Sequence, residues 1–191
     1  MSADEPVRIG MPEDGDLTDA QRAAVERITA GPRGGLVGPF VPLLRSPELM
    51  TRLQLVGEHL RFGSVLDDDL FELTVLVVAR HWHQQFEWGF HQPLAAAKGV
   101  PPSVTDDVAA GRRPASGRPE LALVADLARA LLETGQVDDA SYAAALAALG
   151  EERLVEVVVT VGYYTTLALT MNLARTPAPD GAPRLEDPPE G

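Results

Sequence analysis

Imidazole, carboxylate and indole side chains are concentrated in one short stretch of this chain. Three of its four histidines and both of its tryptophans fall in that stretch, which begins at Glu72 and ends at His91. Its polar and aromatic members are Glu72, Arg80, His81, Trp82, His83, Gln84, Gln85, Glu87, Trp88 and His91. Carboxylates and imidazoles that lie close together are the groups that enzymes use to move protons. The segment is therefore the candidate for the chemistry of the protein.

Helical spacing would place five of these polar residues on one face of a helix. At about 100° per residue, the following five side chains fall within roughly 100° of one helix face: Glu72, Arg80, His83, Glu87 and His91. A bend near residues 80–83 would instead divide the stripe into two half-sites that face each other. Either geometry brings carboxylates and imidazoles together.

Two other interpretations of the stripe stay open at this point. It is also what the solvated face of an ordinary helix looks like. In addition, His83, Glu87 and His91 recur at every fourth position and offer two imidazoles and a carboxylate to a metal ion. On an unbroken helix these groups span roughly 12 Å along the axis, too far for one ion. A metal site would need the helix to break.

Composition narrows the possible functions. The chain has 191 residues, with 16 basic residues against 28 acidic ones and a net charge of −12, which repels nucleic acids and anionic lipids. It has no cysteine, so thiol catalysis and cysteine-held metals are excluded. The first residues are acidic and lack a leader-like apolar run, and runs such as 75–79 are far shorter than the ~20 residues of a membrane span. We expect a cytoplasmic protein with no nucleic-acid or membrane partner.

Start and stop signals for helices predict an all-α fold of about eight helices. Thr18 and Gln21 form a capping box, and Gly31 follows the first helix. Later helices are expected to begin at Ser46, Asp67, Pro101 or Pro102, Pro119, Asp138 and Glu151, with one more ending near Lys98. Residues 1–16 are expected to be a flexible acidic segment, 17–175 the helical domain, and 176–191 a flexible tail rich in proline and glycine.

Segments spread over residues 38–172 resemble the carboxymuconolactone decarboxylase superfamily, which includes the alkyl hydroperoxidase D-like proteins. The matching segments are Gly38–Met50, Leu60–Phe62, Phe71–Trp82, Gln85–Val100 and Leu149–Asn172. The resemblance implies a multi-helix alkyl hydroperoxidase D-like bundle. In the peroxidase branch of the family, a helix glutamate is followed twelve and fifteen residues later by cysteines and nineteen later by a histidine. The corresponding residues here are Glu72, Gln84, Glu87 and His91.

The resemblance is therefore to the cysteine-free branch, and it implies a cofactor-independent lyase or decarboxylase. Its substrate would be a small organic acid, a lactone or an enolisable compound. His91 and Glu87 would be the acid and base, and Glu72 would orient the imidazole. Residues expected to bind substrate are Arg80, His83, His81, Trp88 and Arg61. The alternatives are a non-catalytic scaffold of the same fold and a metal-dependent enzyme that uses His81, His83 and His91.

A degenerate internal repeat accompanies the resemblance. Residues 70–80 align with residues 154–164, and this pairs Glu72 with Glu156. Glu156 and Tyr163 or Tyr164 are the possible remnants of a second polar site. The segment from Glu151 to Arg175 is apolar nearly all round, so it must be buried on every side. We expect a homo-oligomer, with the trimer or hexamer typical of the family favoured and a dimer also compatible.

Overall fold

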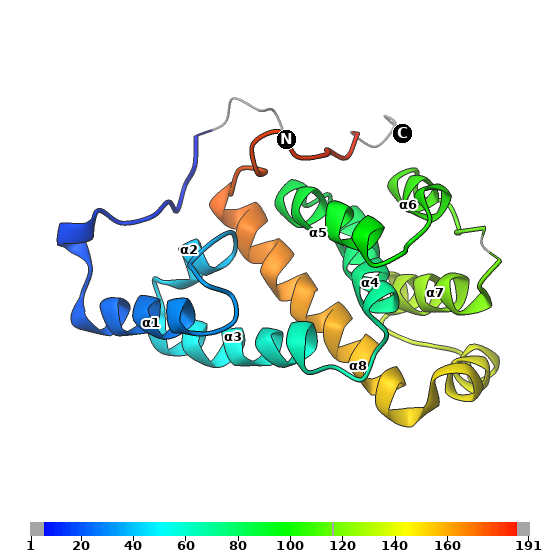
Figure 1. Cartoon of the computed structure of the whole chain (residues 1–191). Coiled ribbons are helices and arrows are strands. Elements are labelled where there is room, and N and C mark those ends of the chain that lie inside the picture. The colour runs from blue at the N-terminus through cyan, green and yellow to red at the C-terminus, as the bar shows by residue number, and fades with distance from the viewer. Residues whose placement is uncertain (1–5, 116, 187–191) are drawn as a thin grey trace. The chain divides into compact units, whose positions relative to one another are not determined.

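The computed structural model describes residues 6–115 and 117–186, and these form helices without any strand, as Figure 1 shows. The all-α prediction is confirmed. The α-helices are α1 (Asp19–Ala30), α2 (Phe40–Leu43), α3 (Pro47–Phe62), α4 (Asp68–His81), α5 (Gln85–Ala97), α6 (Pro102–Ala109), α7 (Pro119–Thr134) and α8 (Asp139–Ala174). A short 3₁₀ turn, Asp14–Asp16, precedes α1.

Several helix boundaries follow directly from the sequence. The capping box of α1 is present, because Gln21 N donates to Thr18 Oγ1 and Thr18 N donates to Gln21 Oε1. Proline opens α3, α6 and α7, where its missing N–H costs no helical hydrogen bond. Gly150 interrupts α8 with φ 76°, so α8 comprises the two predicted helices. The short α2 was not expected, since no helix was predicted between Gly31 and Ser46.

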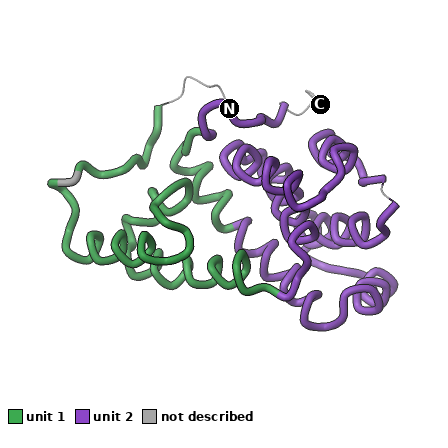
Figure 2. Tube along the Cα trace, viewed as in Figure 1, with its two compact units in different colours: residues 1–64, 166–177 green, residues 65–165, 178–191 purple. Residues whose placement is uncertain are grey.

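The chain divides into two compact units, coloured separately in Figure 2. The first comprises residues 1–64 and 166–177, and in it α1 and α2 pack against α3. The backbone N–H groups of Arg8 and Ile9 both donate to the carbonyl of Ala174. The second unit comprises residues 65–165 and 178–191 and contains α4 to α7. Within the segments expected to be flexible, residues 1–5 and 187–191 lie outside the described residues.

Helix α4 is the centre of the second unit. It packs against α5, α6 and α7, so every residue from Asp69 to Ala79 is buried. Three successive aspartates at its start form ion pairs with other parts of this unit: Asp67 with Arg153, Asp68 with Lys98 and Asp69 with Arg118. The carboxylates also lie at the positive end of the helix dipole, where negative charge is stabilised. Both effects stabilise the start of α4.

Helix α8 is the one helix of the described residues that is long and apolar enough to cross a membrane by length and composition. Half of its most apolar stretch is buried inside the protein, and a single helix of this kind is weak evidence for a membrane span. Residues 139–165 of α8 belong to the second unit and residues 166–174 to the first. The single chain does not bury the helix on every side, because Val155, Val158 and Val159 are exposed.

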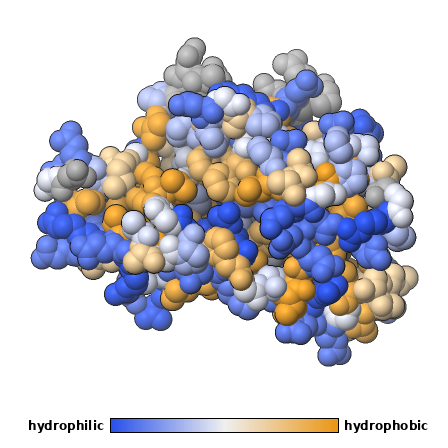
Figure 3. All heavy atoms as spheres, in the orientation of Figure 1, coloured by the Kyte–Doolittle hydropathy of each residue, from blue (hydrophilic) through white to orange (hydrophobic). Residues whose placement is uncertain are grey.

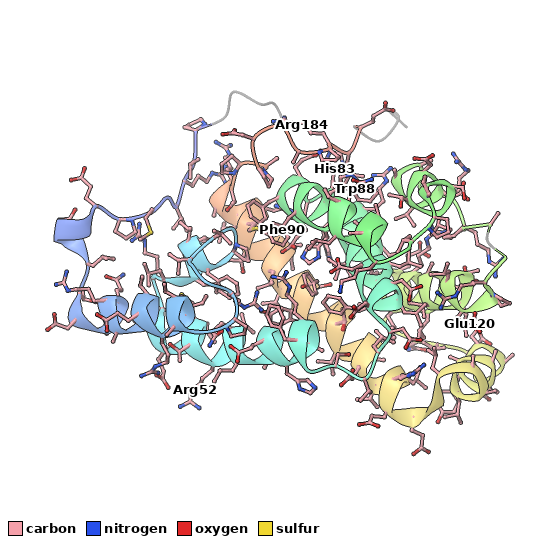
Figure 4. All side chains as sticks on the ribbon, in the orientation of Figure 1. Arg52, His83, Trp88, Phe90, Glu120 and Arg184 are labelled. Carbon is pink, nitrogen blue, oxygen red and sulfur yellow. The ribbon has the colours of Figure 1, made fainter. Side chains whose placement is uncertain are left out.

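Residues 179–185 lie along α5. Gln85 makes two hydrogen bonds to Leu185: its Nε2 donates to the Leu185 carbonyl, and its Oε1 accepts from Leu185 N. Gly89 permits a close approach, since a Cβ at this position would lie 2.9 Å from Ala182 Cβ and 3.2 Å from the Pro183 carbonyl oxygen. Figure 4 shows Arg184 in this segment, near the helix that carries Trp88 and Phe90.

Candidate active site

The polar stripe is broken by a tight turn between α4 and α5. Helix α4 ends at His81. His83 has φ 48°, a left-handed backbone conformation that residues other than glycine rarely adopt. The turn is closed by two backbone hydrogen bonds, from His83 N to the Arg80 carbonyl and from Gln84 N to the Ala79 carbonyl. Gln84 then caps α5, its Oε1 accepting from Phe86 N. The bent geometry is therefore the correct one, and the continuous helix is not.

This turn brings Glu72, Glu87 and His91 into direct contact. His91 Nδ1 lies 2.7 Å from Glu72 Oε2 on the neighbouring helix. His91 Nε2 lies 3.3 Å from Glu87 Oε2, one turn earlier on α5. Each ring nitrogen of the imidazole therefore faces its own carboxylate. We call these three residues the Glu–His–Glu cluster.

The Glu–His–Glu cluster is buried. The side chains of His91, Glu72 and Glu87 are only 3%, 7% and 4% exposed. Aromatic rings adjoin the imidazole: the centroids of Phe90 and Tyr164 both lie 5.2 Å from that of His91, in edge-on geometry. The interpretation as a solvated helix face therefore fails for these three residues. Carboxylates this deeply buried require partners, and the imidazole provides one for both.

Two opposing effects act on the pKa of His91. Burial is the largest single influence and lowers the pKa, because it penalises the charged imidazolium. Hydrogen bonds and charge from Glu72 and Glu87 together outweigh burial, so the pKa of His91 is raised above its ordinary value. The raised pKa extends the pH range over which the charged imidazolium is populated, with Nδ1 facing Glu72 and Nε2 facing Glu87.

One atom of the cluster has no hydrogen-bond partner in the described part of the chain. Glu87 Oε1 is fully buried and unpaired, whereas Glu87 Oε2 faces His91. A buried carboxylate oxygen without a donor is costly, and native proteins keep such atoms where function requires them. Glu87 Oε1 is therefore the atom of the cluster that is left to accept a hydrogen bond from a further donor.

The other predicted site residues are spread more widely. Trp88 is buried on α5, and His83 lies in the turn, where its Nε2 is 3.2 Å from Gln85 Nε2. His81 is exposed at the end of α4, with its ring against Trp82. Arg80 lines a cavity of the second unit to which the cluster does not contribute. Arg61 belongs to the first unit, where its guanidinium lies over the ring of Phe62.

A metal centre was the rival interpretation of the histidines. Across residues 6–115 and 117–186, no group of three or more histidine, cysteine, aspartate or glutamate side chains is arranged to hold a metal ion. His81, His83 and His91 thus do not converge as ligands. Glu72 and Glu87 instead take the two ring nitrogens of His91, the atoms through which a histidine would bind a metal.

Sequence reasoning did not include Tyr164 among the site residues. Its ring contacts His91 and also lies 5.9 Å from Phe71. The sequence did contain a signal for this residue, because the internal repeat singled out Tyr163 or Tyr164 as a possible remnant of a second polar site. Glu156, the other proposed remnant of a second polar site, binds the backbone instead. Its Oε2 accepts hydrogen bonds from Val65 N and Leu66 N just before α4.

The fold is that of the alkyl hydroperoxidase D-like proteins. The chain is similar to the crystal structure of an alkylhydroperoxidase AhpD core, an uncharacterized peroxidase-related protein from Ralstonia eutropha JMP134. The TM-score is 0.75 at 17% sequence identity, and the match covers 92% of this chain and 94% of that one. No protein-family model matches the sequence, and no curated protein does. The expected resemblance to the superfamily is thus confirmed at the level of fold.

Proposed function

We propose that this protein is an acid–base enzyme that moves a proton at a carbon atom of a small organic acid, a lactone or another enolisable compound. The observation that carries the proposal is the buried Glu–His–Glu cluster, in which His91 contacts both carboxylates and Glu87 Oε1 remains unpaired. The proposed chemistry is that of a lyase or decarboxylase, and it uses these side chains alone.

Each residue of the cluster has a distinct role in this proposal. Glu87 Oε1 takes a proton from carbon, and the electron pair of the broken C–H bond moves to the adjacent carbonyl oxygen to form an enolate. The His91 imidazolium beside Glu87 Oε2 stabilises the carboxylate form, and Glu87, once protonated on Oε1, returns that proton to another carbon of the enolate. Glu72 holds His91 in place through Nδ1 and acts as a positioning residue.

The similar Ralstonia eutropha protein is described as peroxidase-related. We do not propose thiol-dependent peroxidase activity for this chain. The chain contains no cysteine, so no thiolate is available to attack a peroxide. Purified protein is expected to show no peroxide reduction coupled to a dithiol. The Glu–His–Glu cluster supports proton transfer instead, because buried acid–base groups with a fixed geometry are suited to it.

Exchange of carbon-bound hydrogen in D₂O tests the proposal, because it detects proton transfer at carbon even when the complete reaction is not identified. A panel of small keto acids and unsaturated lactone acids is incubated with the protein, and loss of the C–H signal is followed by NMR. We expect catalysed exchange or decarboxylation of at least one compound. Glu87→Gln keeps the shape of the side chain but removes the base, so it should lower the rate by about 10²–10⁴.

The matched control is Glu152→Gln, which makes the same chemical change at an exposed position of α8. It should leave the exchange rate unaltered. If wild type and Glu87→Gln exchange every compound at the same rate, then Glu87 is not the base and the proposal fails.

We also propose that the protein self-associates through α8. Val155 is 60% exposed, Val158 43% and Val159 42%, and helical spacing places these three on one face. Leu169 and Leu173, in the part of the helix that belongs to the first unit, are exposed as well. Figure 3 shows that apolar residues also reach the surface elsewhere. Covering such a face with a second copy removes apolar area from water.

Light scattering tests the assembly. The wild-type protein should have at least twice the mass of the 20.4 kDa chain. Val158→Asp introduces a charge into the proposed contact and should shift the mass toward that of one chain. Val37→Asp makes the same change at another exposed valine and should leave the mass unaltered. A wild-type protein that remains a soluble monomer would refute the proposal.

A further inference from the structure

A cavity lies within the second unit, at the ends of three helices. Its volume is about 170 Å³. Its lining residues are Val77, Arg80 and His81 from α4, Val108 and Gly111 from α6 and the turn after it, and Arg129 and Glu133 from α7. None of the Glu–His–Glu cluster is among them, so an inference about this cavity does not rest on the proposed function.

The two arginines of this cavity, Arg80 and Arg129, differ from other basic residues of the second unit because they are not paired directly with a carboxylate. Elsewhere in the second unit, basic side chains pair with aspartates, in the pairs Lys98–Asp68, Arg112–Asp107, Arg113–Asp126, Arg118–Asp69 and Arg153–Asp67. Such pairing is expected in a chain with an excess of twelve acidic residues. Within the described ranges, Arg80 forms no ion pair with a carboxylate. Arg129 forms none either, although its charge acts on Asp107, the partner of Arg112.

The Arg80 guanidinium is also incompletely satisfied by hydrogen bonds. Its Nε is buried and has no acceptor in the part of the chain that the structure describes. Arg129 donates one N–H to the carbonyl of Arg112, out of the five that a guanidinium carries. A buried N–H without an acceptor is costly to keep, so its presence in a cavity indicates an acceptor that comes from outside the chain.

We propose that this cavity binds a small organic monocarboxylate. The fork of N–H groups on a guanidinium matches the two oxygens of a carboxylate, and two guanidinium groups line the same space. Val77 and Val108 are buried and offer apolar walls to the carbon chain of the ligand. The volume equals that of about five to six water molecules, which suits an acid of a few carbon atoms.

The remaining polar groups of the lining favour a single negative charge. Glu133 is exposed and carries a negative charge of its own, so two arginines against one glutamate leave one net positive charge in the lining. His81 is exposed too and adds a ring nitrogen rather than a fixed charge. A doubly charged ion such as inorganic phosphate would leave excess negative charge beside Glu133, and we expect it to bind more weakly than a monocarboxylate.

Isothermal titration calorimetry with butyrate tests the proposal at constant ionic strength, with chloride and inorganic phosphate as comparison anions. Butyrate should bind the wild-type protein saturably, with phosphate weaker and chloride undetected. Arg80→Gln and Arg129→Gln should each weaken butyrate binding by about tenfold or more, because each removes a charge-assisted contact. Arg80→Lys keeps the charge without the fork and should lose part of the affinity.

Arg113→Gln is the matched control. It removes the same charge from a residue that pairs with Asp126 and does not line the cavity, so it should bind butyrate as the wild type does. Circular dichroism shows whether each variant is folded, and Arg129→Gln gives an independent answer if Arg80→Gln is not. Absence of saturable butyrate binding to the wild type at about 10 mM would overturn the proposal. An equal loss of affinity in Arg113→Gln, or tighter binding of phosphate than of butyrate, would also overturn it.

Discussion

His91 Nδ1 and Glu72 Oε2 lie 2.7 Å apart, although their residues are nineteen positions apart and belong to different helices. On one continuous helix, nineteen residues would separate them by about 28 Å along the axis. The contact therefore depends on the turn at residues 82–84, and on the packing of α5 against α4. This pair holds the imidazole on which the proposed chemistry depends.

Replacement of the carboxylate partner should change the protonation of His91. Glu72→Gln removes both the charge and the charged hydrogen-bond acceptor that raise the pKa of His91, while burial continues to lower it. We expect a lower pKa of His91 in Glu72→Gln than in the wild type. An NMR titration of the His91 ring proton measures this difference.

Glu133→Gln is the control for that titration. The pKa of His81 is lowered because its exposed ring is still partly shielded from water by its neighbours, and the charge of Glu133 partly opposes that effect. Glu133→Gln should therefore lower the pKa of His81 further and leave that of His91 unaltered. A pKa of His91 that is the same in Glu72→Gln and in the wild type would contradict the assigned contact.

The raised pKa of His91 also makes stability depend on pH. Between the unfolded pKa of about 6.5 and the higher folded value, the folded protein binds more protons than the unfolded chain, so stability falls as pH rises. The contribution of His91 is complete below pH ~6.5 and is lost as pH rises through the folded pKa. Urea denaturation at a series of pH values measures the free energy of unfolding.

A His91→Gln variant should lose the part of this pH dependence that belongs to His91. The difference in unfolding free energy between wild type and variant should therefore be larger at pH 6 than at high pH, where the wild-type imidazole is neutral. A difference that grows with rising pH would show that the pKa of His91 is shifted in the opposite direction.

The histidines should differ in their importance for activity. His91→Ala is expected to lower turnover of a substrate found in the exchange assay by about 10²–10⁴, the usual contribution of a positioned acid or base. His83→Ala should have a smaller effect, because His83 contacts Gln85 in the turn rather than the carboxylates. A chelator should leave the rate unaltered. Equal losses in both variants, together with inhibition by the chelator, would favour the metal-dependent alternative.

Gly89 should be intolerant of any side chain. In Gly89→Ala the new Cβ would lie 2.9 Å from Ala182 Cβ, so either the terminal segment or α5 must move. We expect a loss of stability of about 1–3 kcal/mol and faster hydrogen exchange at the amide of Leu185, which now donates to Gln85. Gly117→Ala, where a Cβ meets nothing within 4 Å, should show neither effect.

Much of the fold was predictable because its signals are local. The capping box at Thr18, the prolines that open α3, α6 and α7, and the break at Gly150 each depend on neighbouring residues only. The helix α2 was missed because its sequence, rich in proline and glycine on both sides, is typical of a loop. Its formation is favoured by burial of Phe40, Pro42 and Leu43, which a local pattern does not show.

The candidate site was predictable in composition but only partly in geometry. Glu72, Glu87 and His91 were singled out by their residue types and spacing. Helical spacing alone did not decide between one continuous helix and two packed ones, because His83 gives no sequence signal for its left-handed backbone. The contact of Tyr164 with His91 depends on how α8 packs, and the association of Arg80 with Arg129 on how α4 and α7 pack.

The short turn between α4 and α5 determines how α5, which carries Glu87 and His91, is oriented relative to α4, which carries Glu72. A residue added to it would change both the position and the orientation of α5 relative to α4, and would carry His91 and Glu87 away from Glu72 together. Side-chain substitutions can alter the chemistry of the cluster one group at a time, whereas a change in the length of this turn would abolish it at once. The length of the turn, three residues at 82–84, is therefore constrained whichever amino acids compose it.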